Sequence, residues 1–378
     1  MASKVIVTIV SEQTVPNVLF IKELGPADKY IFVSTKKMEF KNTTSNIVKA
    51  AGIENNQCKI IEVIEDSLLD IDSKFSKELD LQDDDEVFVN ITGGTKIMSL
   101  GVYNYFSRKG ASDIFYIPLG KNQIIKVFPL RNNRLNLLNF RINLLDYLKA
   151  YGVQVQLNSF SSKNTLLKCE EQTQQLFQSF ISTNKTLLTS AAEDIRANGF
   201  RGKNIHQNQE KESALFEDAL VFGHSGVKFA QSNLVSRKET KYITGEWFEE
   251  FIYSIIKKTL NKSDEEIGMG VQLVKGDTPN EYDIIFTHNN SLNVIECKTD
   301  ITDTEKGSIN RLFTTTLYKA ATLKKEFGLW VNYYIFALND FSILTDEQKN
   351  RAKLFDIKLV GSEILSNEDA LTEFIQKM

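Results

Sequence analysis

The first third of the chain alternates short apolar runs with segments of helical spacing. Strands are predicted at 5–10, 30–33, 59–65, 86–91 and 113–117, and helices at 15–24, 44–51, 67–79 and 96–109. Regular strand–helix alternation predicts an α/β domain with a parallel, doubly wound sheet. In such sheets ligands bind beyond the carboxyl ends of the strands, where the strand order reverses. The loops that follow these strands are therefore candidates for a binding site.

The last third contains a hairpin pattern within residues 280–298. Two runs rich in β-branched and aromatic residues flank Asn289-Asn290, a pair that tolerates the left-handed backbone of a tight turn. If these two residues form the turn, His288 pairs with Ser291. The register of the two strands then follows by counting.

Counting places charged residues opposite one another at the far end of this hairpin. Asp283 falls opposite Glu296, and Glu281 falls opposite Lys298. Opposed carboxylates are costly, because they repel each other and lose hydration. A divalent cation such as Mg²⁺ or Mn²⁺ removes that cost, and two carboxylates with a lysine around a metal suit the hydrolysis of phosphodiesters. The alternative is a surface hairpin with ordinary charges.

Both faces of the hairpin are largely apolar. Asp283 and Glu296 share their face with Ile285 and Val294. The opposite face is expected to carry Tyr282, Ile284, Phe286, Ile295 and Cys297. A strand pair that is apolar on both faces predicts the interior of a covered sheet.

Further elements are predicted around the hairpin. Helices are expected at 245–256, 310–327, near 346–354 and from 367, and strands at 330–337 and 357–360. In the first helix Glu249 shares a stripe with Ile252 and Ile256, so it is expected to face the sheet, whereas Glu250 is expected to face solvent. The alternative role for Glu249 is a favourable interaction with the helix macrodipole. Candidates for contacts with substrate phosphate from the second helix are Arg311, Tyr318 and Lys319.

The middle of the chain has the weakest periodicity. Helices are predicted at 143–151, 165–181 and 210–222 and a strand at 153–157, in a region rich in Gln and Asn. We expect three parts: a first domain at 1–135, a mostly helical connector at 136–240 and a second domain at 241–378.

One loop of the first domain has a composition suited to anions. Thr92-Gly93-Gly94-Thr95-Lys96 follows the fourth strand and begins a helix. Glycines let backbone amides approach a ligand closely, and a helix N-terminus favours negative charge. The spacing matches neither a Walker loop nor a dinucleotide fingerprint, and a purely structural turn is the alternative.

Composition narrows the classes of protein. The chain has 378 residues, a net charge of −4, three cysteines and three histidines. This length suits two or three domains, and the charge provides no global basic surface for nucleic acid. The sparse cysteines and histidines do not favour a disulfide framework or a zinc cluster. No apolar run approaches the roughly 20 residues of a membrane span, and the N-terminus lacks a signal-peptide pattern, so a cytoplasmic protein is expected.

The hairpin resembles the signature of the PD-(D/E)xK nucleases, a restriction-endonuclease-like α/β fold. Asn280-Glu281-x-Asp283 matches the first motif and Glu296-Cys297-Lys298 the second, although Tyr282 stands where the family often has Pro. The resemblance implies that Asp283 and Glu296, with the carbonyl of Cys297, bind Mg²⁺ or Mn²⁺. It also implies that Lys298 orients the nucleophile and that Glu281 and Glu249 serve as auxiliary ligands or hold water at the site.

The loops of the first domain resemble those of the CRISPR-associated Rossmann-fold (CARF) sensor domain over about residues 1–130. The matching segments are Ser11 to Asn17 after the first strand and Thr92 to Lys96 after the fourth. CARF domains bind cyclic oligoadenylates across the two-fold axis of a homodimer. The resemblance implies ligand contacts from Ser11, Gln13, Thr14, Asn17, Thr35, Thr92, Gly93, Gly94, Thr95, Lys96 and Met98.

A CARF sensor joined to a PD-(D/E)xK domain is similar to the ancillary effector nucleases of type III CRISPR systems. This similarity implies a metal-dependent nuclease that is activated by a cyclic oligoadenylate, with cyclic tetra-adenylate the expected ring. The expected substrate is single-stranded RNA or DNA, and nicking of duplex DNA stays open. Two alternatives remain open. One is a ligand-responsive regulator that only binds nucleic acid, and the other is a constitutive repair or restriction nuclease.

Overall fold

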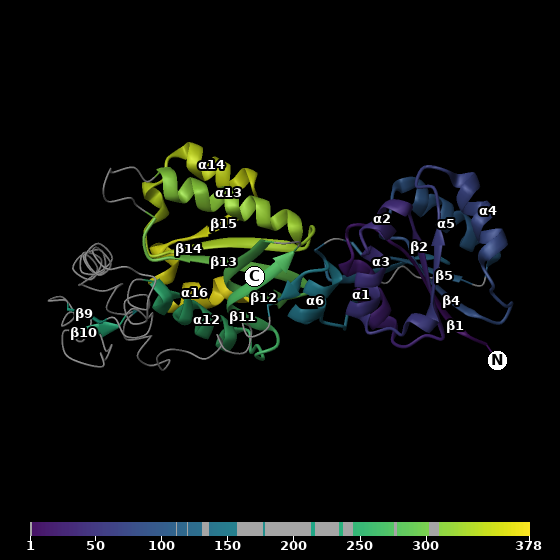
Figure 1. Cartoon of the computed structure of the whole chain (residues 1–378), viewed down its shortest axis with the longest axis horizontal. Coiled ribbons are helices and arrows are strands. Elements are labelled where there is room, and N and C mark those ends of the chain that lie inside the picture. Colours follow the sequence, from purple (N-terminus) through teal and green to yellow (C-terminus); the bar gives the residue numbers. More distant parts are fainter. Residues whose placement is uncertain are drawn as a thin grey trace.

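The computed structural model describes residues 2–110, 112–118, 120–130, 136–156, 177, 213–215, 234–236, 245–275, 278–301 and 310–378. The chain forms two α/β domains that lie end to end (Figure 1). The N-terminal domain, in purple and blue, lies at one end, and the C-terminal domain, in green and yellow, lies at the other. None of the described helices is long and apolar enough to cross a membrane.

The N-terminal domain is built on a seven-stranded sheet of order β3-β2-β1-β4-β5-β6-β7. Its elements are β1 Lys4–Ile9, α1 Val15–Leu24, β2 Lys29–Ser34, α2 Lys36–Phe40, α3 Thr43–Ala51, η1 Asn55–Gln57, β3 Cys58–Glu62, α4 Leu68–Glu78, β4 Glu86–Asn90, α5 Lys96–Lys109, β5 Ser112–Tyr116, β6 Gln123–Phe128 and β7 Asn136–Leu137. The predicted parallel, doubly wound sheet is confirmed for β1 to β5, and the strand order reverses between β1 and β4.

Besides η1, two features of this domain were not predicted. Strands β6 and β7 extend the sheet in antiparallel fashion. The connection from β5 to β6 is too short for the crossover that a parallel strand needs, so β6 returns as a hairpin. The short helix α2 is the second feature, and Thr35 caps its N-terminus by accepting a hydrogen bond from the N–H of Met38.

The described part of the middle region supports some of the predicted elements. Helix α6 spans Leu144–Ala150, and β8 spans Gln154–Val155 and pairs with the edge of the C-terminal sheet. The helix predicted at 210–222 is wrong at its start, since β9 (Ser213–Leu215) is a strand that pairs antiparallel with β10 (Leu234–Ser236). The helix predicted at 165–181 lies outside the described residues except for Phe177, which is helical.

The C-terminal domain has a six-stranded mixed sheet of order β15-β14-β13-β12-β11-β8. Its elements are α12 Trp247–Thr259, β11 Ile267–Lys275, β12 Thr278–His288, β13 Ser291–Lys298, α13 Asn310–Glu326, β14 Val331–Ala337, η3 Phe341–Ile343, α14 Asp346–Leu354, β15 Ile357–Val360, α15 Ser362–Leu365 and α16 Glu368–Gln376. Helices α13 and α14 cover one face of the sheet and α12 and α16 the other (Figure 1). Strand β11 was not predicted, and the other predicted elements are confirmed.

The predicted hairpin register is confirmed over the five pairs from His288–Ser291 to Ile284–Ile295. Asn289 and Asn290 form the turn with φ of 50° and 62°. Positive φ at both central residues is what a type I′ turn requires.

Tyr282 lies on the opposite face of the sheet from the one predicted. It packs against Phe327 with ring centroids 5.6 Å apart, on the α13 side, whereas Ile284 lies on the α12 side. Its partner in β11, Val271, lies on the α13 side as well, and the preceding Gly270 has φ of 56°. Met269 and its partner Ile284 lie on the α12 side, so the alternation of faces is interrupted in both strands, at Gly270 in β11 and at Asp283 in β12. Strict period-2 counting along β12 therefore fails at Asp283.

Candidate active site and ligand loops

Three predicted catalytic side chains converge at the carboxyl end of β13. The ammonium of Lys298 lies 2.8 Å from Glu296 Oε1 and 3.7 Å from Asp283 Oδ2. Both carboxylates thus reach the same ammonium, so they point to the same end of the sheet. The predicted pairings of Asp283 with Glu296 and of Glu281 with Lys298 are both wrong as backbone pairs, because the β12–β13 ladder ends at Ile284–Ile295.

Asp283 is held by a backbone donor just beyond the end of the β12–β13 hydrogen-bond ladder. The N–H of Cys297 donates a hydrogen bond to Asp283 Oδ2 at 2.7 Å. Because backbone pairing between β12 and β13 has stopped here, the Asp283 carboxylate accepts the hydrogen bond that a backbone carbonyl of a continuing strand would otherwise accept. Burial raises the pKa of the Cys297 thiol, so the thiol stays protonated and its sulfur is a poor metal ligand.

Glu296 is buried and held by groups from three elements. Lys319 of α13 lies 3.4 Å from its Oε1, and the hydroxyl of Tyr333 in β14 donates to Oε2 at 3.4 Å. Burial alone would raise the pKa of Glu296, but Lys298 and Lys319 together hold it below its ordinary value. Glu296 is therefore ionised at neutral pH.

Two neighbouring acids titrate differently. Burial and the charge of Glu296 raise the pKa of Asp283 to about 6, partly offset by Lys298. Burial and the charge of Asp283 raise the pKa of Glu249, on α12, to about 8. At neutral pH Glu249 therefore retains its proton in the absence of a further cation.

One prediction on α12 is corrected and another is supported. Glu250, which was expected to face solvent, is buried at 2% exposure. Helix α12 packs against α16 as well as against the sheet, so it is buried on more than one side. Glu249 is half-buried, and its interaction with Asp283 places it at the site. Glu281 is exposed and pairs with Gln272 in β11.

The donor atoms suit a hard divalent cation. Among the residues that the structure describes, no three His, Cys, Asp or Glu side chains form a ready-made metal cluster. The ammonium of Lys298 contacts both Asp283 and Glu296. A raised pKa means that positive charge around a buried carboxylate does not fully compensate its negative charge. Mg²⁺ or Mn²⁺, bound through the carboxylate oxygens, would supply the missing positive charge. The residues therefore fit such a cation.

The two predicted ligand loops lie side by side at the point where the first sheet reverses. A Cβ added to Gly93 would lie 2.4 Å from the carbonyl oxygen of Ile9 and 3.1 Å from Ser11 Oγ. Gly94 has φ of 77°, and a Cβ there would lie 2.6 Å from Ile9 Cγ2. Both glycines are required by the close packing of the second loop on the end of β1.

A buried polar network supports these loops. The side-chain amide of Asn17 donates to Thr8 Oγ1 at 2.6 Å and to the carbonyl of Ile9 at 2.8 Å. Asn90 donates to the same Thr8 oxygen and accepts hydrogen bonds from the N–H and hydroxyl of Thr92. Thr8 and Asn90 were missed by sequence reasoning, although each is a polar residue within an otherwise apolar strand.

Comparison with protein-family models identifies both halves of the chain. Residues 5–147 match the model of the Card1 CARF domain, and residues 236–377 match that of the Card1-like endonuclease domain. The chain therefore consists of a Card1-type CARF domain followed by a Card1-like endonuclease domain. A comparison with curated protein sequences gives no significant match.

Solved structures share the fold of this Card1-type chain. Can2 from Sulfobacillus thermosulfidooxidans, in complex with cyclic tetra-adenylate, has a TM-score of 0.74 and 19% identity, over 98% of this chain and 96% of Can2. VC1899 from Vibrio cholerae has a TM-score of 0.73 and 19% identity, over 99% and 97% of the two chains. A type III CRISPR defence DNA nuclease activated by cyclic oligoadenylate has a TM-score of 0.50 and 16% identity, over 89% of this chain and 45% of its own.

Burial divides the predicted ligand contacts of the CARF domain into two groups. Buried residues are Thr14, Asn17, Thr35, Gly93 and Met98, of which Asn17 and Met98 are 0% and 1% exposed. These residues support the loops from inside. Gly94, Thr95 and Lys96 are exposed, and Ser11 and Thr92 are half-buried. Thr95 also caps α5 by accepting a hydrogen bond from the N–H of Met98.

Gln13, another predicted ligand contact, touches the endonuclease domain. Its Oε1 accepts a hydrogen bond from the N–H of Leu329 at 2.8 Å and one from the hydroxyl of Tyr151 at 3.4 Å. The neighbouring Gly328 has φ of 82°, and a Cβ there would lie 2.1 Å from the Tyr151 hydroxyl. The first ligand loop is thus bonded to the turn between α13 and β14.

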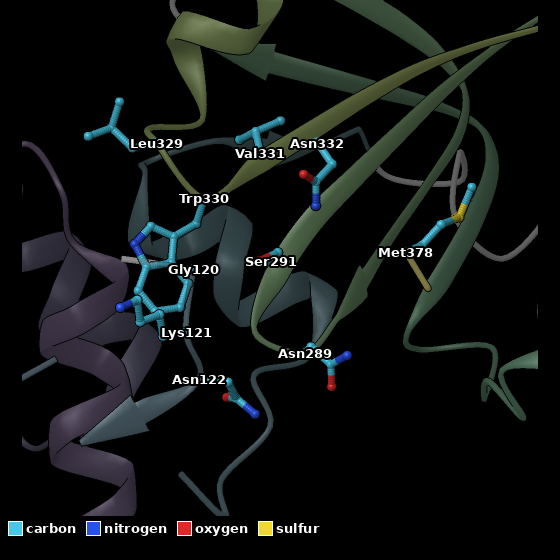
Figure 2. A pocket seen from close by; sticks show the side chains of 10 residues that line it. All are labelled: Gly120, Lys121, Asn122, Asn289, Ser291, Leu329, Trp330, Val331, Asn332 and Met378. Carbon is cyan, nitrogen blue, oxygen red and sulfur yellow. The ribbon is translucent and has the colours of Figure 1, made fainter. Parts of the chain in front are cut away.

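A cavity of about 500 Å³ also lies between the CARF and endonuclease domains (Figure 2). It is lined by Gly120, Lys121, Asn122, Asn289, Ser291, Leu329, Trp330, Val331, Asn332 and Met378. None of these is a predicted site residue. The cavity adjoins the Ser291 end of β13, whereas Glu296 and Lys298 lie toward the other end. It is therefore separate from the acidic site.

Proposed function

We propose that this protein is a nuclease that a cyclic oligoadenylate activates in type III CRISPR defence, with cyclic tetra-adenylate as the activator. We propose that its substrate is single-stranded RNA or DNA and that cleavage requires Mg²⁺ or Mn²⁺. This proposal rests on the convergence of Asp283, Glu296 and Lys298 within an endonuclease domain. The structure of Can2 in complex with cyclic tetra-adenylate supports the choice of activator.

Each residue of the acidic site has a role in this proposal. Asp283, Glu296 and the carbonyl of Cys297 hold the cation. When bound, the cation stabilises negative charge on the scissile phosphate and lowers the pKa of a water. Lys298 orients the attacking water and balances developing charge. Glu249, whose proton is lost near pH 8, and the exposed Glu281 hold water around the site.

The activator is proposed to bind at the exposed rim of the CARF loops. Gly94, Thr95 and Lys96 form the N-terminus of α5, a 14-residue helix, where amides and the Lys96 ammonium favour phosphate. A cyclic, symmetric ligand suits the axis of a homodimer. The exposed apolar side chains of Ile64, Leu69 and Leu100 on the adjacent α4–α5 surface support such a dimer.

A cleavage assay tests this proposal. Labelled single-stranded RNA and DNA are incubated with each cyclic oligoadenylate in turn, with Mg²⁺, Mn²⁺ or EDTA. Cleavage is expected only with the cyclic tetra-adenylate and a cation, and Glu296→Ala abolishes it while ligand affinity remains. Lys96→Ala weakens ligand binding by about tenfold, the cost of one charged phosphate contact.

The two alternatives give different outcomes in the same assay. Equal cleavage with and without ligand would identify a constitutive nuclease. Ligand-dependent binding of nucleic acid without any cleavage would identify a regulator.

A further inference from the structure

Lys319 is a second ammonium at the acidic site, and it reaches the site from solvent. Its Nζ lies 3.4 and 3.5 Å from the two carboxylate oxygens of Glu296, whereas Lys298 lies at 2.8 Å. The side chain of Lys319 is 41% exposed and that of Lys298 is 24% exposed. Lys319 is therefore the looser and more accessible of the two.

Without a bound cation or substrate, the positive and negative side chains of the site are equal in number. Asp283 and Glu296 bring two negative charges, and Lys298 and Lys319 bring two positive ones. A divalent cation held by the carboxylates would replace the ammoniums as their counter-charge. An ammonium has three donors and strongly favours a phosphate oxygen.

We propose that Lys319 binds a phosphate oxygen of the nucleic-acid strand beside the scissile bond. The inference rests on the proposed nuclease function and adds a substrate-binding residue to it. Lys319 lies on α13, which covers the face of the sheet toward which Glu296 points. A swing of its flexible side chain transfers the ammonium from the carboxylate to the strand.

The neighbouring candidate on α13 has different contacts. The ring of Tyr318 packs on Phe355 at 5.6 Å, with the guanidinium of Arg351 5.8 Å from its centroid. Tyr318 is thus engaged with α14, while Lys319 points to the site. Lys324, farther along α13, is paired with Asp356 at 2.5 Å and provides a matched control for charge removal.

The test measures binding of a single-stranded oligonucleotide to the full chain at a fixed Ca²⁺ concentration, so that a divalent cation can occupy the carboxylates, over a range of KCl concentrations. Each phosphate that a cation neutralises adds about 0.7 to the slope of log K against log salt for a single strand. Lys319→Gln is expected to lower the slope by about 0.7, while Lys319→Arg and the control Lys324→Gln keep it. In cleavage assays Lys319→Gln is expected to raise KM roughly tenfold with kcat changed less than about threefold, as for a contact made equally in ground and transition states.

An unchanged salt slope for Lys319→Gln would overturn the inference, as would a wild-type protein that binds no oligonucleotide. A fall in kcat with unchanged KM and slope would show instead that Lys319 only positions Glu296. The binding slope is independent of turnover. A protein that binds with the expected slopes but cleaves nothing would therefore refute the proposed nuclease function and leave the phosphate contact standing.

Discussion

The acidic site keeps two carboxyl groups in an environment that disfavours their charge. The pKa of Asp283 is raised to about 6 and that of Glu249 to about 8, in both cases first by burial and then by a neighbouring acid. The pKa of Glu296 is instead lowered, because Lys298 and Lys319 lie beside it. Perturbed acids of this kind are typical of functional sites, since a structural role is better served by an apolar or fully paired side chain.

Glu249 should make stability depend on pH. Its folded-state pKa of about 8 lies above its ordinary value of 4.5, so its contribution is complete below pH 4.5 and is lost as pH rises toward 8. Glu249→Gln removes this loss, so the variant should gain stability relative to wild type between pH 5 and pH 9. We expect a gain on the order of 1 kcal/mol, or a few degrees in Tm, measured by thermal unfolding in EDTA. The exposed Glu265→Gln is the control, and an equal gain there would contradict the prediction.

Cation binding should depend on the ionisation of Asp283. Below pH 6 a proton competes with the metal for this carboxylate, because ligands must be deprotonated. Millimolar Mn²⁺ should therefore raise Tm more at pH 8 than at pH 5, and Asp283→Asn should remove most of the difference. The same Mn²⁺ effect in Asp283→Asn would show that the cation binds elsewhere.

At the scale of elements, the hairpin β12–β13 links the acidic site to the first domain. Its turn residue Asn290 is 1% exposed. Asn290 accepts a hydrogen bond from the N–H of Ile142 at 2.8 Å and donates to the carbonyl of Phe140 at 3.0 Å and to Asn122 Oδ1 at 2.5 Å. Asn290 thus forms part of the turn and also holds it in place through buried hydrogen bonds.

A matched pair of glycine substitutions separates these two functions of the turn. Glycine accepts the left-handed backbone at both positions, so Asn290→Gly loses only the buried hydrogen bonds. We expect Asn290→Gly to lower the free energy of unfolding by about 2 kcal/mol and the exposed Asn289→Gly to change it by less than about 0.5 kcal/mol, measured by urea denaturation. Equal effects would mean that the buried bonds contribute nothing beyond the turn.

At the scale of the molecule, the two domains share one apolar core and several polar contacts. Core residues of α1, α3 and α6 join the cluster that lies under α13. The hydroxyl of Tyr147 hydrogen-bonds to the carbonyls of Phe327 and Trp330, both at 3.1 Å, beside the Gln13–Leu329 bond. A change in the first ligand loop can therefore reach α13, which carries Lys319.

Gln13→Ala tests this connection between the domains. Loss of its bond to Leu329 should reduce activation by ligand, expressed as the ratio of cleavage rates with and without cyclic tetra-adenylate, by about tenfold. The Kd for the ligand should change by less than about threefold, since allosteric coupling and direct contact are separable free energies. The adjacent Glu12→Gln, which breaks an ion pair with Lys41, is the control. A Kd that rises in parallel with the loss of activation would make Gln13 a ligand contact, as its sequence position predicts.

Local patterns predicted most of the elements. The apolar run of β1, the amphipathic helix α12 and the turn at Asn289-Asn290 each depend on residues close in sequence. The hairpin register followed from that turn, because residues pair by counting once its two central positions are known. The types of residue at 283, 296 and 298 also indicate the chemistry from the sequence alone.

Tertiary structure alone decided where several of these side chains point and what they contact. The ring of Tyr282 packs on Phe327, on the α13 side, and the buried Glu250 lies on α12, which contacts α16 more than 100 residues away in the sequence. The contact of Gln13 with Leu329 and that of Lys319 with Glu296 likewise join distant segments. Sequence periodicity describes one element against an average surrounding, whereas these contacts exist only once particular elements have packed together.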